Sequence, residues 1–325
     1  MIDSLLIVGY GRQGHRHLDV ALRFDLAQLI VTVDPRFATR TGAGKHFTDL
    51  ATALEYSGYD AAIVASPTTT HAEIVETLLR RNVPTLVEKP IAADFAQGEA
   101  LIELMNSTGT ALFVGYVERF NPVVRLLGDV MRSGVIGGPI SMVMKRFGIP
   151  ASEPQDADVI HDLSVHDIDL VCNLNAAPRL LGAGGRVDHS TGQIHTAQLL
   201  LRSDDLTVGI ESSRMAARRE RTISVLTEKA YLVADLLGQH MDVLKSPSQS
   251  FDDGELAAFA TVSPHDLGMR LAPRTREPLA DELKALLASL SGGPDPMLAT
   301  PQSALAVSFI ADAASAMIME ADPTR

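Results

Sequence analysis

The sequence has few of the features that mark secreted and membrane proteins. Its only cysteine is Cys172, so no disulfide can form within the chain, which fits a reducing compartment. No apolar stretch reaches the ~18 residues needed to span a bilayer. The first residues lack the basic segment and cleavage site of a signal peptide. We therefore expect a cytoplasmic protein with no membrane partner.

Positive charge is also scarce. The chain carries 28 Lys and Arg residues against 40 Asp and Glu residues, a formal net charge of −12. This balance argues against a general nucleic-acid-binding role, but it does not exclude a local basic pocket for a phosphorylated ligand. With 325 residues, 46% of them hydrophobic, the chain is long enough for two domains with sizeable cores.

The clearest motif is a glycine-rich turn near the N-terminus. An apolar run over residues 4–8 leads into Gly9-Tyr10-Gly11-Arg12-Gln13-Gly14. A helical pattern over residues 15–24, a second apolar run over 29–33 and then Asp34 follow. Strand, glycine turn, helix, strand and acid in this order are typical of a dinucleotide-binding βαβ unit.

Each glycine of this turn has a physical task. Gly9 allows the tight turn, Gly11 lets a pyrophosphate approach the backbone, and Gly14 lets the helix pack close to the sheet. The helix N-terminus offers its N–H groups to the phosphates, and Arg12 and Gln13 lie in this segment. The alternative is a glycine-rich turn with no ligand, but the flanking strands and the spaced acid favour cofactor binding.

The end of the second strand indicates which cofactor is bound. Asp34 is placed to accept hydrogen bonds from the ribose diol of NAD, and its carboxylate would repel the 2′-phosphate of NADP. Arg36 and Arg40 follow closely and can bind that phosphate instead. We expect NAD, with NADP as the alternative.

Strands and helices continue to alternate up to about residue 118, which predicts a doubly wound parallel sheet. The predicted helices are residues 49–57, 72–81 and 94–106, and the predicted strands are 61–65, 85–87 and 111–115. Ligands bind such sheets at the carboxyl ends of the strands. Beyond the glycine turn, that edge receives Ser66-Pro67-Thr68 with His71, Glu88-Lys89-Pro90, and Tyr116.

The pattern changes after residue 118, so we predict a Rossmann domain over 1–118 and an α+β domain over 119–325. Strands with short connections indicate a large open sheet that is mainly antiparallel. The predicted strands are residues 140–147, 180–187, 193–201, 207–213, 221–227 and 230–236. The predicted helices are residues 121–133, 159–174, 279–289 and 303–320, and residues 246–275 are expected to form an irregular loop.

Three side chains suit hydride-transfer chemistry. Lys89 lies at a buried strand end, where a lowered pKa would let it bind a substrate hydroxyl and stabilise the developing alkoxide. Asp162 and His166 are four residues apart on a predicted helix, so the carboxylate can orient the imidazole as a general base. The alternatives for this helix are a metal site, which the spacing of His161 and His166 disfavours, and a solvated acidic face.

Other basic and imidazole side chains are interpreted as surface or packing residues and not as parts of a site. Arg214, Arg218, Arg219 and Arg221 form a basic run, which is more typical of a solvated surface or an oligomer contact than of a phosphate site. His15 and His17 are expected to be surface or packing residues of the first helix.

Together these motifs resemble the Gfo/Idh/MocA oxidoreductase family over nearly the whole chain. The combination of Glu88-Lys89-Pro90 with Asp162 and His166 is specific to this resemblance. It implies a Rossmann domain, an open-sheet domain used in homodimers or homotetramers, and catalysis by Lys89, Asp162 and His166 without a metal. The implied cofactor-binding set is Gly9, Gly11, Arg12, Gln13, Gly14, Asp34, Arg36, Ser66, Pro67, Thr68, His71, Glu88 and Lys89.

Within the family, residues 114–122 are similar to a stretch of UDP-N-acetylglucosamine 3-dehydrogenases and related nucleotide-sugar enzymes. This similarity implies substrate contacts from Lys89, Tyr116, Glu118, Arg119, Asn121, Arg146, Asp162 and His166. The sequence departs from the pattern in three places. Asp158 stands where glycine is common, His161 where an apolar residue is usual, and Arg214 where an aromatic is frequent.

We therefore expect an NAD(P)-dependent dehydrogenase that acts on a ring hydroxyl or ketone of a sugar or nucleotide sugar, with C3 of UDP-N-acetylglucosamine as the first candidate. One alternative is an inositol or free-polyol dehydrogenase of the same fold. The other is a non-enzymatic NAD-binding sensor.

Overall fold

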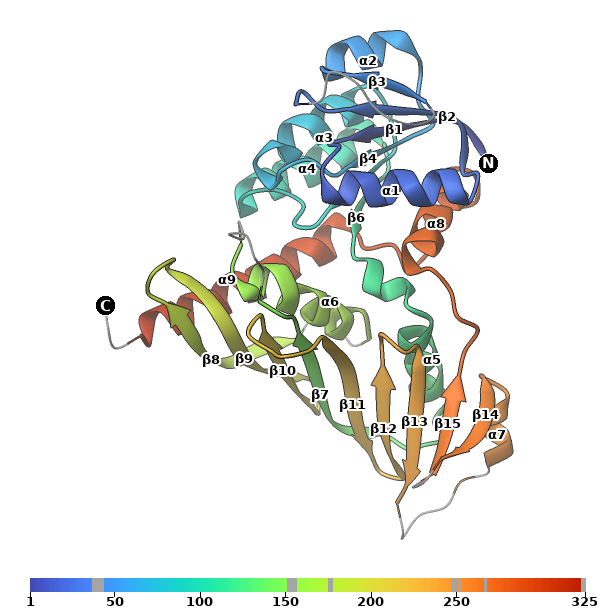
Figure 1. Ribbon diagram of the computed structural model, residues 1–325, viewed down its shortest axis with the longest axis vertical. Coiled ribbons are helices and arrows are strands. Elements are labelled where there is room, and N and C mark those ends of the chain that lie inside the picture. The colour runs from blue at the N-terminus through green and yellow to red at the C-terminus, as the bar shows by residue number, and fades with distance from the viewer. Residues whose placement is uncertain are drawn as a thin grey trace. The chain divides into compact units, whose positions relative to one another are not determined.

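The computed structural model describes residues 1–36, 44–150, 157–174, 178–246, 251, 253–265 and 268–322. The chain divides into two compact units (Figure 1). The first contains Met1–Val117 and Glu277–Leu305, and the second contains Glu118–Arg276 and Ala306–Arg325.

The first unit is built on a six-stranded parallel sheet in the order β3-β2-β1-β4-β5-β6. Its strands are β1 (Ile2–Val8), β2 (Ala27–Val33), β3 (Lys45–Phe47), β4 (Ala61–Val64), β5 (Thr85–Glu88) and β6 (Leu112–Gly115). Its helices are α1 (Arg12–Arg23), α2 (Leu50–Tyr56), α3 (His71–Arg80), α4 (Phe95–Thr108) and α8 (Pro278–Gly292). The predicted doubly wound sheet is confirmed, and the strand order reverses between β1 and β4, where such sheets bind ligands.

Local sequence explains these elements. All four residues of β4 are buried, as expected for a central parallel strand covered on both faces. Asp49 and Asp94 cap α2 and α4 by accepting the backbone N–H groups of Thr52 and Gln97, each at 2.8 Å. The short strand β3 was not predicted, because three residues give too little pattern.

A segment near the C-terminus, Glu277–Leu305, belongs to the first unit. The sequence analysis assigned this segment to the second domain, residues 119–325. The backbone N–H of Val114 donates to the carbonyl oxygen of Ala299 at 2.9 Å, and this extends the edge of the sheet. Gly98 of α4 lies against Leu305, where any larger side chain would collide. These contacts place Glu277–Leu305 with the Rossmann core.

The second unit is built on a nine-stranded sheet in the order β14-β15-β13-β12-β11-β7-β10-β9-β8. Its strands are β7 (Pro139–Phe147), β8 (Arg179–Asp188), β9 (Gln193–Ser203), β10 (Leu206–Ser213), β11 (Glu220–Thr227), β12 (Ala230–Asp235), β13 (His240–Lys245), β14 (Thr261–His265) and β15 (Gly268–Ala272). Its helices include α5 (Pro122–Ser133), α6 (Val165–Leu174) and α7 (Asp253–Ala257). All pairings except β7 with β10 are antiparallel, as predicted.

The expected irregular loop over 246–275 is wrong. β14 and β15 pair in antiparallel fashion there, and β15 adds to β13, which was not predicted either. These strands have five or six residues, and β14 contains Pro264, which weakens the strand pattern.

One face of this sheet packs on helices and the other is open (Figure 1). Residues alternate between buried and partly exposed along β10, as expected for a half-buried sheet. On the open face, the side chains of Val143, Leu200, Leu226 and Tyr231 are each more than 40% exposed.

The last helix, α9 (Pro301–Glu320), corrects the expectation that no segment is long and apolar enough to span a membrane. It meets that threshold by length and composition. The indication is weak, because packing helices meet it too, and Ala304, Val307, Ala311 and Ala314 of α9 are fully buried.

Candidate functional site

The glycine turn has the geometry that a dinucleotide needs. Gly9 has a φ of +96°, and a Cβ there would lie 2.5 Å from the backbone nitrogen of Ser66. A Cβ on Gly14 would collide with the carbonyl oxygen of Gly9. A Cβ on Gly11, in contrast, would meet no atom closer than Nη2 of Arg36, at 3.7 Å. The start of α1 has no side-chain cap, so its N–H groups are available to a pyrophosphate.

Asp34 lies beside this turn and is ionised. It accepts hydrogen bonds from the backbone N–H groups of Tyr10 (2.8 Å) and Arg36 (2.9 Å). The Arg36 guanidinium also donates to both carboxylate oxygens. Burial raises the pKa of Asp34, but the bonds from Arg36 and Tyr10 outweigh it and lower the pKa to about 2. Arg36 is therefore held beside the acid, whereas Arg40 lies outside the described residues.

His71 ties together two of the predicted cofactor segments. Its ring nitrogens lie 3.0 Å from the carbonyl oxygen of Ser66 and 2.8 Å from that of Pro90. The residue is 1% exposed, and burial lowers its pKa. Both nitrogens face backbone carbonyl oxygens, so His71 supports this segment, and its predicted contact with the cofactor stays a prediction. Pro67 and Thr68 belong to the short turn between these contacts.

The Glu88-Lys89-Pro90 segment is held at its other end as well. His17 of α1 is fully buried, and its Nε2 lies 2.8 Å from Oε1 of Glu88. Burial raises the pKa of Glu88, but the His17 contact, with smaller contributions from Lys89 and His71, outweighs burial and the net shift of the pKa is downward. Lys89 thus lies between Glu88 and Pro90, each of which contacts a buried histidine. His17, predicted to be a surface or packing residue, packs inside the unit and contacts Glu88.

In the second unit, the predicted helix over 159–174 begins with a π-helical turn. Residues Ile160–Ser164 form this turn, and α6 continues from Val165. The Asp158 carboxylate caps the turn by accepting the backbone N–H groups of Ile160 and His161, both at 2.9 Å. A π-turn is wider than an α-turn, so the simple four-residue spacing of Asp162 and His166 does not describe their geometry.

Exposure separates the polar residues of this helix into two groups. Asp162 and His166 are partly exposed, whereas Asp167 and Asp169 are buried. Asp167 accepts three hydrogen bonds from Arg146, the shortest at 2.7 Å. Asp169 pairs with Arg119 through two bonds, one of them 2.8 Å long. The buried acids are therefore neutralised internally, whereas Asp162 and His166 are partly exposed, so a ligand can reach them.

The side chains that the nucleotide-sugar resemblance assigned to substrate lie mostly in this buried network. Arg146 also donates to Glu118 at 2.8 Å, and Arg221 donates to the same oxygen. Asn121 donates to the carbonyl oxygen of Leu236 at 3.0 Å. Glu118, Arg119, Asn121 and Arg146 thus make internal contacts, and Tyr116 is likewise only 2% exposed, so the substrate contacts of these five residues stay a prediction.

Sequence reasoning did not predict a second charged cluster around the π-turn. His161 lies 2.8 Å from Asp158 and 2.9 Å from Asp312 of α9. The bond to Asp158 is the largest effect on His161, and it raises the pKa of the imidazole to about 9. Arg214, from the basic run, donates to Asp162 at 3.1 Å. Arg218 of the same run is 83% exposed, as expected for a solvated surface. Arg214 and Arg221 instead pair with acids of the second unit, so a solvated surface does not describe these two residues.

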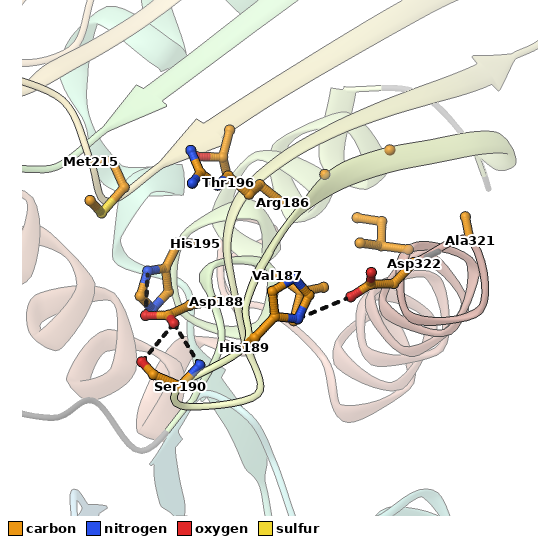
Figure 2. Close-up of a pocket in the computed structure, with 13 residues that line it drawn as sticks. Arg186, Val187, Asp188, His189, Ser190, His195, Thr196, Met215, Ala321 and Asp322 are labelled. Atoms are coloured by element: carbon orange, nitrogen blue, oxygen red, sulfur yellow. Dashed lines mark hydrogen bonds and ion pairs between the residues drawn. The ribbon is translucent and has the colours of Figure 1, made fainter. Parts of the chain in front are cut away.

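A separate cavity of about 820 Å³ lies at the end of the β8–β9 hairpin (Figure 2). His195 lies 3.7 Å from Asp188, and His189 lies 3.6 Å from Asp322 at the end of α9. None of the predicted site residues lines this cavity. Among the described residues, no group of three or more His, Cys, Asp or Glu side chains could hold a metal ion.

Comparisons with known proteins agree with this geometry. Residues 4–116 match the model of the Gfo/Idh/MocA oxidoreductase family, NAD-binding Rossmann fold. A myo-inositol dehydrogenase of Streptomyces leeuwenhoekii is 30% identical over 230 residues, 65% of this chain and 69% of the relative. The scyllo-inositol 2-dehydrogenase (NAD(+)) of Bacillus subtilis is 27% identical over 268 residues, 76% of this chain and 78% of that protein.

The fold is also similar to that of a solved nucleotide-sugar enzyme. The UDP-N-acetylglucosamine 3-dehydrogenase of Acidithiobacillus ferrooxidans superposes with a TM-score of 0.81 at 20% identity, covering 98% of this chain and 99% of the other. At this identity the similarity concerns the fold alone.

The buried network predicts a large effect of Arg146. We expect Arg146→Met to lower the free energy of unfolding by about 3–5 kcal/mol, because it leaves two buried carboxylates without their main partner. Urea denaturation measures this. The control, Arg132→Met, removes an exposed ion pair with Asp129 and should cost less than about 1 kcal/mol. A similar small loss in both variants would contradict the structural role of Arg146.

His161 predicts a pH-dependent stability. Its pKa is raised on folding, so its contribution is complete below its ordinary value of 6.5 and is lost as the pH rises through about 9. We expect about 1–2 kcal/mol, since solvent screens this partly exposed group.

The test compares urea denaturation of wild type and His161→Gln at pH 6 and pH 9.5. The difference between the two proteins should shrink at the higher pH. The control, His189→Gln, removes an imidazole that is 62% exposed. A difference that is independent of pH would rule out the protonated His161 pair.

Proposed function

Since this chain belongs to the Gfo/Idh/MocA family of NAD-binding sugar and polyol dehydrogenases, we propose that it oxidises a ring hydroxyl of an uncharged polyol or sugar with NAD. One observation carries the proposal. Of the four polar residues Asp162, His166, Asp167 and Asp169, only the pair suited to hydroxyl chemistry is partly exposed.

The cofactor supplies the hydride acceptor when it is bound. The glycine turn and the free start of α1 fit its pyrophosphate, and Asp34 fits its ribose diol. The Asp34 carboxylate favours NAD because it repels a 2′-phosphate. NADP is the alternative, because the Arg36 guanidinium that donates to both Asp34 oxygens can also bind that phosphate.

The chain's own residues then manage the proton. We assign His166 as the base that removes the hydroxyl proton while hydride leaves the same carbon, so that an alcohol becomes a ketone. Lys89 binds the reacting oxygen and stabilises its developing negative charge. Asp162 binds and positions the substrate through hydrogen bonds to its hydroxyl groups.

The buried network bears on the choice of substrate. Four side chains that suggested a nucleotide sugar are occupied internally, which favours a free polyol such as an inositol. UDP-N-acetylglucosamine remains the second candidate, because its 3-dehydrogenase from Acidithiobacillus ferrooxidans is also a relative, 26% identical over 188 residues.

Lys89 provides the direct test. Formation of NADH from NAD, or of NADPH from NADP, is followed with myo-inositol, scyllo-inositol or UDP-N-acetylglucosamine. We expect wild-type turnover with NAD, and Lys89→Ala should lower kcat by about 10²–10⁴-fold because the alkoxide loses its donor. NAD affinity should change little.

The control is Lys284→Ala, an exposed lysine of the same unit, which should leave kcat unchanged. Full activity of Lys89→Ala would refute the assigned mechanism. Cofactor binding by wild type without turnover on any ring compound would favour the sensor alternative.

We also propose that the open face of the nine-stranded sheet forms a homo-oligomer. Its exposed apolar side chains, such as Val143 and Leu200, are typical of a covered surface. Val143→Glu combined with Leu200→Glu should reduce the mass measured by sedimentation to that of one chain. Arg132→Glu on α5 changes the net charge by the same amount at an exposed position outside this face and should not. A wild-type monomer would contradict this proposal.

A further inference from the structure

The three positions where the sequence departs from the family pattern lie in one cluster. Oδ1 of Asp158 caps the π-turn and lies 2.8 Å from Nδ1 of His161. Ser315 of α9 donates to the other Asp158 oxygen at 3.1 Å. The Arg214 guanidinium reaches the backbone carbonyl oxygen of Asp158 at 3.0 Å. Asp158, His161 and Arg214 therefore act as one structural group at the start of the helix that carries Asp162.

Arg214 is the member of this cluster with unused bonding capacity. It directly follows β10, and its backbone N–H donates to the carbonyl oxygen of His195 at 3.0 Å. Its side chain is 10% exposed, and Nη2 makes the bonds to Asp162 and to the Asp158 backbone. Nη1 is buried and has no hydrogen-bond partner within the described chain. A buried donor left in this state is costly, so an acceptor that arrives with a ligand would be bound strongly.

The neighbouring group shows from which side such a ligand would come. The Asp162 side chain is 36% exposed, so the carboxylate that Nη2 holds is open to a substrate. Because Nη1 is shielded from water, we expect the ligand to enter on the Asp162 side and to shift the side chains that cover this nitrogen. One guanidinium would then orient the carboxylate through Nη2 and contact the substrate through Nη1.

The charge of the cluster limits the kind of acceptor. Asp158, Asp162 and Asp312 carry three negative charges, and Arg214 with protonated His161 carries two positive ones. The group therefore has a net charge of −1, which disfavours a second carboxylate or phosphate at this point. A neutral hydroxyl oxygen can accept the free N–H without adding charge.

We propose that Arg214 is a specificity-determining residue whose Nη1 donates a hydrogen bond to a hydroxyl oxygen of an uncharged ring substrate, adjacent to the hydroxyl that is oxidised. This inference rests on the proposed function. It adds a substrate contact from a position outside the Lys89, Asp162 and His166 set.

The experiment compares wild type with Arg214→Met on a substrate and its deoxy analogues. The probes are myo-inositol, or UDP-N-acetylglucosamine if only that is oxidised, each with its monodeoxy ring analogues. For wild type, one missing hydroxyl beside the reacting carbon should lower kcat/KM by about 10- to 100-fold. Arg214→Met should raise KM for the parent compound by a similar factor and should no longer distinguish it from that analogue.

A purely structural role of Arg214 gives a different result. Misplacement of Asp162 alone would lower kcat/KM by the same factor for the parent compound and for every analogue, and this would overturn the proposal. A wild-type preference for glucuronate over uncharged rings that is lost in Arg214→Met would also overturn it, because the acceptor would then be a carboxylate.

Two further proteins keep the result interpretable. Arg218→Met removes an exposed arginine from the same connecting segment and should behave as wild type. If Arg214→Met fails to fold, Arg214→Gln replaces it, since its amide can still donate to Asp162. Failure of the proposed function is distinct, because wild type itself would then oxidise no ring compound.

Discussion

The second unit depends on one buried cation, the guanidinium of Arg146. In the register of β7 and β11, Arg146 lies directly opposite Arg221, and like charges in that position repel. Oε1 of Glu118 accepts a hydrogen bond from each of them at 2.8 Å, and Asp167 of α6 binds the other side of Arg146. The four groups are neutral in sum, so burial is tolerated. Burial raises the pKa of Asp167, whereas the two arginines outweigh burial at Glu118 and lower its pKa. This arrangement fixes α6, and with it the partly exposed face of the helix, on the sheet.

In the Rossmann unit, buried imidazoles rather than guanidinium groups join separate elements through polar contacts. His17 reaches from α1 to Glu88, and His71 reaches from α3 to the backbone at Ser66 and Pro90. The segment that carries Lys89 is therefore tied to the helix whose N-terminus fits the pyrophosphate. Buried polar contacts of this kind are costly unless they are satisfied, so they specify one arrangement rather than add much stability. In each unit a candidate reactive side chain lies next to such a contact.

Much of the fold could be predicted from the sequence, because local patterns determine it. The glycine turn, the apolar strands and the spaced Asp34 define the first unit, and two-residue alternation defines most strands of the second. β14 and β15 were missed because they are short, and the π-turn because its cause is the Asp158 carboxylate rather than any periodicity. The internal partners of the four side chains from the nucleotide-sugar resemblance could not be predicted for a different reason. A motif gives the position of Arg119 or Arg146, but whether the side chain meets substrate or a buried acid depends on tertiary packing.

The segment from His161 to Asp169 shows how one short stretch can serve structure and chemistry together. Asp167 and Asp169 face arginines in the core, where each charge is matched by a partner within 3.1 Å. Asp162 belongs to the wider π-turn, and its partner Arg214 comes from the end of β10. Because the inner acids already hold the helix on the sheet, the outer residues can vary without loss of the fold. Asp158, His161 and Arg214 adjoin Asp162 and carry none of the core ion pairs, so a change of substrate preference at these positions leaves the attachment of the helix to the sheet intact.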